Sequence, residues 1–507
     1  MPLINKIASG DVQGEKKKQL FPVYGLLSYY LRDVCAALRG SYRARQIEAL
    51  QGALFDEKSI DQVFEHTGTI LSVLIHEGYS IESLFSLLQS AFLYRSDRTF
   101  SFKKNFDFSR HILETTEKWY EVIFRLEGFT HEPPNDIAGF EFSRAFTVTG
   151  ADSRAKALLS PGLNVVFAKT RVEGRDDRSV GMLARKKLDD ILDLIRFELE
   201  IDVITVKPDF VSVSTDPSKV RVYPLPSQVP NPRKNIEPDE FMAFVSKIGN
   251  VIENPLLDSQ SKEKIRSALH FYRTGRDAEQ FENKFLNWWT ALEYLVKTGE
   301  GGNIMAEIEK RLLPILVLGY SRKHLRSYAK ALYFCRVRLS AEAAARFHVN
   351  DYKDLNLLNL FSLLRNDDEF REIENKLSRY PSLLFYLRRF RDQTHDAAAI
   401  MVFYGEHEKR IRWHINRIYR IRCDIVHSAE YSMNLTLLGA NLEYYLKYVL
   451  TSILENLTNN KAISSLTELY DRTEYAFICL KGDLAAKNTD LHDRLLRDGE
   501  HQTLLCA

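Results

Sequence analysis

The chain has 507 residues, a formal net charge of +2 and a hydrophobic fraction of 45%. Its length suggests about three domains of ~150 residues each, and its apolar content is sufficient for several buried cores. The near-neutral charge excludes a protein that binds polyanions over its whole surface, so any nucleic-acid-binding surface must be local.

The N-terminal quarter shows helical periodicity. After a polar, lysine-bearing start over residues 1–20, apolar residues recur at steps of three and four from Phe21 to about Phe124. The segments LLSYYLRDVCAALRG and IESLFSLLQSAFLYR show this pattern most clearly. The sequence therefore predicts a helical N-terminal region over residues 1–124.

A small α+β module is predicted over residues 125–223. Strand periodicity appears in GFEFSRAFTVTG, in NVVFAKTRVEG from Asn164 and in ITVKPDFVSVST from Ile204. An amphipathic helix, LARKKLDDILDLIRFEL from Leu183, lies between the last two. No glycine-rich phosphate loop follows any of these strands.

A proline-rich linker is predicted over residues 224–236, because PLPSQVPNP has four prolines in nine residues. After it the pattern is helical almost to the end. We expect a helical domain over residues 237–460, with a helical insertion at about 300–396, and a helical tail over 461–507. The predicted fold class is therefore mainly α, with a helical N-terminal region and a small α+β module.

The segment IRWHINRIYRIRCDIV is predicted to form a helix with an arginine on its apolar face. At about 100° per residue, Arg422 falls in the middle of the apolar stripe. Arginine is almost never fully buried unless it is paired. His427 follows Arg422 after four intervening residues. The stripe consists of Ile411, Ile415, Ile418, Ile425 and Val426.

This arrangement resembles the signature of the HEPN superfamily of metal-independent ribonucleases, in which an arginine and a histidine lie near the end of a helix. The segment over residues 267–296, with Ala291, Leu292 and Glu293 in an aromatic-rich helix, is similar to the first helices of the Apea-like HEPN group of bacterial phage-defence proteins. The IRxxIVH over residues 421–427 is typical of that group. The resemblance covers roughly residues 237–457, which it implies form a HEPN-like helical bundle.

The resemblance implies cleavage of RNA without metal or cofactor, in a symmetric homodimer or a larger assembly of dimers. The ribose 2′-OH would attack the neighbouring phosphate, with His427 as general base or acid and Arg422 stabilising the charge of the phosphorane. Five residues of helix turn through about 500°, so the two side chains lie ~140° apart. They converge only if the helix ends or bends near His427, or if a second copy supplies one of them. The alternative is structural: Arg422 pairs with an internal carboxylate, and His427 caps a helix C-terminus.

Four further residues are candidates to support the site. An acidic residue and a lysine four positions apart, here Glu293 and Lys297, line the cleft in several HEPN groups; an exposed ion pair is the alternative. The family usually has Asn, Asp or His directly after the motif arginine, where this chain has Cys423. Asp424 follows and is the candidate substitute.

The helix that carries the motif is also rich in cations. Arg412, Arg417 and Arg420 are candidates for binding RNA phosphates, although such runs are more often a solvated helix face. Trp413 and Tyr419 have the spacing of core residues, which we favour over base stacking. A similar arrangement at Arg389, Arg391 and His395 has no matching upstream helix and is interpreted as an ordinary polar helix end.

The predicted location is the cytoplasm. Five scattered cysteines without a CxxC pair favour reduced thiols and exclude a zinc cluster or a disulfide framework. We find no secretory signal, and the apolar run near Leu312 is shorter than the ~20 residues that cross a bilayer. No membrane partner is expected. The cysteines are Cys35, Cys335, Cys423, Cys479 and Cys506.

The leading functional prediction is a HEPN endoribonuclease that acts as a toxin effector of bacterial anti-phage defence. By family analogy the RNA is tRNA, and the N-terminal half restrains the enzyme or senses a phage-derived trigger or partner protein. One alternative is a non-catalytic HEPN module for dimerisation or binding in a defence or toxin–antitoxin complex; another is a partner of a nucleotidyltransferase. Zinc proteases, serine hydrolases and NTPases are excluded by the absence of their motifs.

Overall fold

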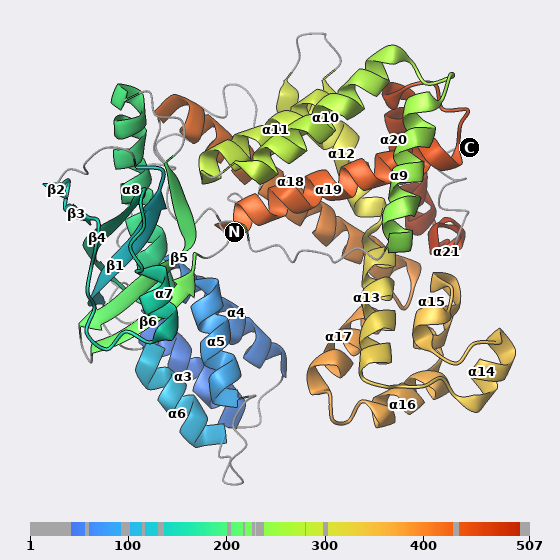
Figure 1. The fold of residues 1–507 in the computed structure, drawn as a ribbon. Coiled ribbons are helices and arrows are strands. Elements are labelled where there is room, and N and C mark those ends of the chain that lie inside the picture. The colour runs from blue at the N-terminus through green and yellow to red at the C-terminus, as the bar shows by residue number, and fades with distance from the viewer. Residues whose placement is uncertain are drawn as a thin grey trace, which may run out of the picture. The chain divides into compact units, whose positions relative to one another are not determined.

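The computed structural model shows a mainly helical chain with one small antiparallel sheet (Figure 1). The contacts group the chain into two compact units, Met1–Ser227 and Gln228–Ala507. The predicted helix at 26–40, most of the predicted linker and residues 497–507 lie outside the described residues. The structure describes residues 42–55, 60–92, 102–113, 117–129, 136–199, 204–215, 218–225, 229, 238–278, 280–297, 303–428 and 436–496.

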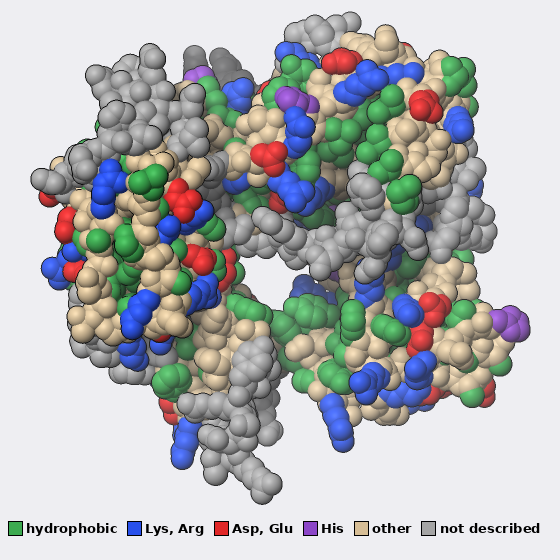
Figure 2. Space-filling view, viewed as in Figure 1, with side chains coloured by type: hydrophobic (Ala, Val, Ile, Leu, Met, Phe, Trp, Pro, Cys, Tyr) green, Lys and Arg blue, Asp and Glu red, His purple; other side chains and the backbone are tan. Residues whose placement is uncertain are grey.

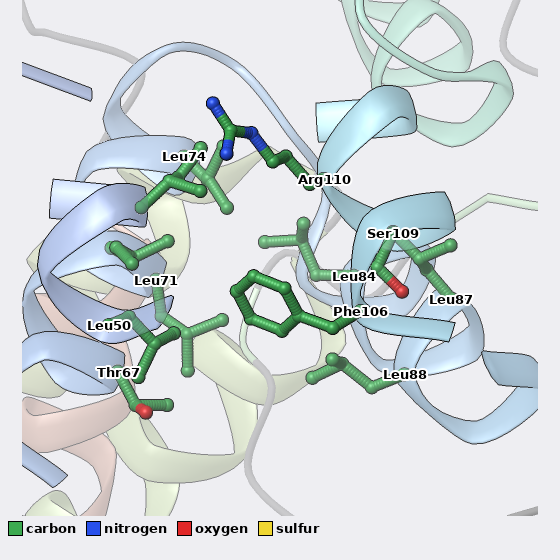
Figure 3. Close-up of a pocket in the computed structure, with 12 residues that line it drawn as sticks. Leu50, Thr67, Leu71, Leu74, Leu84, Leu87, Leu88, Phe106, Ser109 and Arg110 are labelled. Carbon is green, nitrogen blue, oxygen red and sulfur yellow. The ribbon is translucent and has the colours of Figure 1, made fainter. Parts of the chain in front are cut away.

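Four helices open the described part of the N-terminal unit. Their apolar faces form a small core that includes Ile70, Leu74 and Phe106. A cavity of about 80 Å³ lies in this core (Figure 3), lined mainly by leucine and isoleucine side chains and Phe106, with Thr67, Ser109 and Arg110 as its polar lining residues. The helices are α3 (Tyr42–Phe55), α4 (Ile60–His76), α5 (Ile81–Phe92) and α6 (Phe102–Leu113).

The sheet has six strands in the order β2-β3-β4-β1-β5-β6, and every neighbouring pair is antiparallel. Helix α8 (Asp177–Leu199) packs on β4, β1 and β5, whereas α7 (Ser153–Leu158) contacts β5 and β6. The strands are β1 (Lys118–Glu127), β2 (Asp136–Ile137), β3 (Phe140–Ser143), β4 (Val165–Gly174), β5 (Thr205–Thr215) and β6 (Ser218–Pro224).

The predicted boundary between residues 124 and 125 falls inside β1, so the N-terminal helical region ends earlier than expected. Strand β1 is central, and Val122, Ile123 and Phe124 are all buried because both faces of the sheet are covered. Tyr120, Val122, Phe124 and Leu126 alternate along one buried face, so the strand period is present in the sequence and begins before the predicted boundary. The predicted strand around Phe146 and Val148 lies outside β3, which ends at Ser143.

Asp176 links the helices to the sheet module. Its carboxylate accepts hydrogen bonds from the Ser80 amide at 2.8 Å, the Ser80 hydroxyl at 2.9 Å and the Ser83 hydroxyl at 2.8 Å. It also accepts from the amides of Arg178 and Ser179 in the first turn of α8, both at 3.0 Å. One carboxylate therefore fixes the start of α5 against the start of α8.

The C-terminal unit is a helical bundle around one continuous apolar core. Helices α12 and α20 both pack against α18, so parts of the predicted insertion and of the predicted tail belong to the core. The helices are α9 (Pro238–Glu253), α10 (Ser259–Asp277), α11 (Phe281–Val296), α12 (Ile304–Leu318), α13 (Tyr320–Phe334), α14 (Ala341–Phe347), η1 (Tyr352–Asp354), α15 (Leu357–Arg365), α16 (Asp367–Lys376), α17 (Pro381–Asp392), α18 (Ala397–Ser428), α19 (Thr436–Asn459), α20 (Leu466–Ala485) and α21 (Asp490–Leu496).

The packing of α10 on α11 requires a glycine at position 275. A Cβ there would lie 2.7 Å from Trp288 Cδ1 and 2.9 Å from the Lys284 carbonyl oxygen. We expect Gly275→Ala to lower the free energy of unfolding by about 1–3 kcal/mol. The matched control is Gly405→Ala in α18, where nothing lies within 4 Å of the new methyl group. It should raise the free energy of unfolding by about 0.5–1 kcal/mol, and urea unfolding of both variants measures the contrast.

Candidate functional site

Helix α18 runs without interruption through both motif residues. It extends from Ala397 to Ser428, so helical structure continues from Arg422 to His427 and ends one residue later. The Arg422 side chain lies toward the bundle and is 29% exposed, whereas His427, one residue before the helix end, is exposed. Five residues of regular helix separate the two directions by about 140°. One copy of the chain therefore does not bring these two side chains together.

The apolar stripe around Arg422 is shorter than predicted. Ile411, Ile415 and Ile418 are buried, but Ile425 is only partly buried and Val426 is 49% exposed. The last turn of α18 is therefore less buried than the turns before it. Arg422 lies where buried helix gives way to exposed helix.

Arg422 has one acidic neighbour. Its Nη2 lies 3.9 Å from Glu293 Oε1 on α11, and both side chains are about one quarter exposed. Within the described part of the chain, Arg422 makes no hydrogen bond. A guanidinium carries five hydrogen-bond donors. At 3.9 Å the contact with Glu293 is a long ion pair, and none of the five donors makes a hydrogen bond to a described residue. The internal carboxylate of the structural alternative is therefore present, but it does not saturate the arginine.

Aromatic side chains hold Glu293 in place. The indole Nε1 of Trp289, one turn earlier on α11, donates a hydrogen bond to Glu293 Oε1. The Trp289 ring packs on Tyr419 of α18, with centroids 5.7 Å apart. The neighbouring Cys423 side chain, hydrogen-bonded to Tyr419, raises the pKa of Tyr419. The sequence analysis did not identify Trp289 as a contact of Glu293. The available signal was its position one turn before Glu293 in the same aromatic-rich helix.

The other three supporting candidates make no ion pair or hydrogen bond with the Arg422 side chain among the described residues. Lys297 follows the last residue of α11 and is exposed, and the described residues contain no ion pair between it and Glu293. Cys423 is half-buried and Asp424 is exposed. Of the four, the structure brings only Glu293 to the arginine.

The three candidate RNA-binding arginines differ in their surroundings. Arg412 pairs with Glu309 of α12 and with Glu408, the latter at 3.1 Å, so its charge is already neutralised. Arg417 and Arg420 are exposed, and neither has an ion pair among the described residues. On the face drawn in Figure 2, basic and acidic side chains are interspersed, as the small net charge suggests.

The prediction that Trp413 is a core residue is wrong. Its side chain is 45% exposed, and Lys409 Nζ lies 4.9 Å from the ring centroid. Helical spacing placed it at the edge of the apolar face, and that edge faces solvent. Tyr419, in contrast, is partly buried against the core. The second arginine–histidine pattern is a polar helix end, where Arg391 pairs with Asp367, and His395 with Asp396 at 3.0 Å.

Two histidines outside the arginine–histidine motif, His324 of α13 and His407 of α18, lie against the same tyrosine ring. The His407 ring stacks on Tyr320 with centroids 3.4 Å apart, and His324 lies 4.5 Å from the same ring. Burial, together with the charges of Lys323 and Arg410, lowers the pKa of His407 to about 3 and that of His324 to about 4. Both rings are therefore neutral in the folded protein near neutral pH.

We expect the protein to lose stability in mild acid because of these histidines. Unfolded histidine titrates near ~6.5, so their contribution is complete above that pH and is lost as the pH falls toward the folded values. Between pH 7 and pH 5, His407 alone should account for about 1–2 kcal/mol of the loss. Urea unfolding of His407→Gln should show a weaker pH dependence by that amount. Equal pH dependences for the wild type and the variant would contradict the assignment.

No family model, no curated protein and no solved structure matches this chain. Among the described residues, no group of three or more His, Cys, Asp or Glu side chains is placed to hold a metal ion. None of the described helices is both long and apolar enough to cross a bilayer. Any function assigned to the chain therefore rests on the residues of the site itself.

Proposed function

We propose that residues 237–457 form an endoribonuclease domain of the HEPN type, Apea-like group, whose cleft is completed by a second copy of the chain. The observation that carries this proposal is the state of Arg422. Its guanidinium is partly exposed, lies 3.9 Å from a single carboxylate and makes no hydrogen bond to the described residues. A planar guanidinium at the edge of the core, with hydrogen-bond donors that no described residue accepts from, is suited to binding a phosphate group of a ligand.

The unbroken helix supports the two-copy arrangement. A regular α18 directs Arg422 and His427 about 140° apart, which favours a site whose arginine and histidine come from different chains. A two-fold axis beside the last turns of α18 would place His427 of one copy near Arg422 of the other, since a two-fold interface reuses one patch. Glu293 beside each guanidinium reduces the repulsion between two such arginines.

The proposed chemistry needs only side chains. His427 takes a proton from the ribose 2′-OH or gives one to the departing 5′-oxygen. The attacking oxygen forms a bond to phosphorus as the bond to the 5′-oxygen breaks, which leaves a 2′,3′-cyclic phosphate. Arg422 stabilises the negative charge on the phosphorane oxygens. Glu293, fixed by Trp289, orients the guanidinium.

A non-catalytic dimerisation or binding module is the second candidate. The Glu293–Arg422 pair favours it, because an arginine with an internal carboxylate has a structural explanation. Cys423 in place of the family's usual residue after the arginine points the same way. In that case purified protein binds partners or RNA without cleaving.

In the cell, we propose that the enzyme is a toxin effector of anti-phage defence in the cytoplasm, with tRNA as the class of substrate by analogy alone. An RNase that was always active would damage its own host. The N-terminal unit, which has its own sheet and its own cores, is the part available to restrain the enzyme or to sense a phage-derived trigger.

Cleavage is expected to need no divalent metal. Incubation of purified protein with RNA in EDTA should give the same rate as in Mg²⁺, and mass spectrometry should find 2′,3′-cyclic phosphate ends or their opened forms. Loss of cleavage in EDTA that Mg²⁺ restores would contradict the mechanism. No cleavage under either condition, for protein that is folded and dimeric, would favour the non-catalytic module.

A further inference from the structure

A second group of cations lies around Arg410, earlier on α18 than His427. Arg410 is seventeen positions before His427, and at 1.5 Å per residue this places it about 25 Å away along the helix. The group is formed where α13, α18 and α19 meet, and it consists of Tyr320, Lys323, Arg410 and Tyr444 (the junction surface). None of these residues belongs to the motif around Arg422.

The two cations of the junction surface are held by neutral groups. Lys323 Nζ lies over the Tyr444 ring, 4.2 Å from its centroid. Arg410 Nη2 donates to the Tyr320 hydroxyl at 3.3 Å, and Arg410 Nε donates to the Glu406 carbonyl at 3.3 Å. In the described chain, neither cation has a carboxylate partner. Arg412, two residues after Arg410, has two, so this bundle does neutralise cations elsewhere on the same helix.

The local structure makes this arrangement unfavourable without an anion. Lys323 lies in the first turn of α13, which has no acidic residue and no side-chain cap. Burial lowers the pKa of Lys323, and the charges of Lys323 and Arg410 help to lower the pKa values of His324 and His407. The site thus has a positive potential. Two acids are near Arg410 in the sequence of α18: Glu406, and Glu408, which pairs with Arg412 and Lys481.

From this surface a line of polar and aromatic groups continues along the exposed side of α18. Trp413 is 45% exposed, and Arg417, Arg420 and His427 are exposed at later turns. Proteins bind single-stranded nucleic acid with cations placed along the nucleic-acid backbone and with exposed aromatic rings on which bases stack. The exposed Trp413 ring therefore favours a nucleic acid over an acidic protein as the partner.

We propose that the junction surface binds a phosphate group of single-stranded RNA, with Lys323 and Arg410 as the contacting cations. The bound strand then follows the exposed side of α18 past Trp413 toward His427. As a route to the cleavage site this inference depends on the proposed function, but the binding itself does not. The surface also sets a minimum length for tight-binding RNA, because both ends of the route must be occupied.

The test measures RNA binding by the whole chain. Binding of a labelled 20-nucleotide oligouridylate is detected by fluorescence anisotropy. Its riboses carry 2′-O-methyl groups, so attack by a 2′-OH cannot occur and binding is measured whether or not the protein is a nuclease. We expect Lys323→Gln and Arg410→Gln each to weaken binding about fivefold. The slope of log affinity against log salt should fall by about 0.7 for each phosphate that the variant no longer neutralises. Lys323→Arg should retain most of the affinity.

The matched control is Lys353→Gln. Lys353 is also exposed and lies over a tyrosine ring, 4.0 Å from the centroid of Tyr333, at the far end of α13. Its loss should change neither affinity nor salt slope. Thermal unfolding of every variant confirms that the fold is retained.

Three results would overturn the proposal. The wild-type protein does not bind the RNA, or the Lys323→Gln and Arg410→Gln variants bind as tightly as Lys353→Gln, or inorganic phosphate alone displaces bound RNA at low millimolar concentration. If RNA binding depends on the junction surface but the protein cleaves no natural RNA, this inference is supported and the proposed nuclease function is contradicted. If the wild type cleaves RNA but both variants bind as tightly as the wild type, the nuclease function is supported and this inference is contradicted.

Discussion

Replacement of His427 by alanine should abolish RNA cleavage and leave the fold intact. Removal of a general acid or base typically costs 10²–10⁴-fold in rate. The side chain is exposed at the end of α18, so its loss creates no cavity, and the free energy of unfolding should change by less than about 0.5 kcal/mol. Initial rates on a defined RNA, measured beside circular dichroism and thermal unfolding, give both results.

His395→Ala is the matched control for this experiment. His395 is also exposed, at 62%, and also lies near an arginine in the second arginine–histidine pattern. That variant should cleave at the wild-type rate. A His427→Ala protein that keeps full activity, or a His395→Ala protein that loses it, would show that the wrong histidine has been assigned.

The second large effect is expected at Arg422. Both Arg422→Ala and Arg422→Lys should lower the cleavage rate about 10²–10³-fold, the usual cost of removing a donor that stabilises transition-state charge. Lysine should fail because an ammonium does not supply a planar fork of donors. At 29% exposure, with one carboxylate 3.9 Å away, the arginine contributes little to stability, so both variants should fold.

Arg420→Ala separates catalysis from general charge. Arg420 lies on the same helix, is exposed and has no ion pair within the described chain. Its loss should weaken RNA affinity a few-fold and leave the rate at saturating RNA unchanged. If Arg422→Lys retained full activity, or if Arg422→Ala were unfolded, the arginine would have the structural role of the alternative interpretation.

The helices of the candidate site could be predicted from sequence because their apolar periodicity is long and regular. The predicted span of 411–426 lies inside α18, and Ile411, Ile415 and Ile418 of its apolar stripe are buried. Strand β1 was missed although Tyr120, Val122, Phe124 and Leu126 alternate along it. The buried Ile123 interrupts that alternation with a run of three apolar residues, and such a short run fits a helix as well as a strand.

The contacts that define the site could not be predicted in the same way. The approach of Glu293 to Arg422 depends on how α11 packs on α18, a tertiary contact between residues 129 positions apart in sequence. Whether Trp413 is buried depends on which side of α18 other helices cover. The junction surface joins Lys323 of α13, Arg410 of α18 and Tyr444 of α19, which no local pattern relates.

The central claim is that one catalytic cleft takes Arg422 from one copy and His427 from another, and mixing two inactive variants tests it most directly. Arg422→Ala and His427→Ala proteins, each inactive alone, are mixed in equal amounts under conditions that allow subunit exchange. Half of the dimers then carry both substitutions, and each of these has one complete composite site. We predict that about one quarter of wild-type RNA cleavage returns. A mixture that exchanges subunits, as shown by native mass spectrometry, and yet remains inactive would contradict the account.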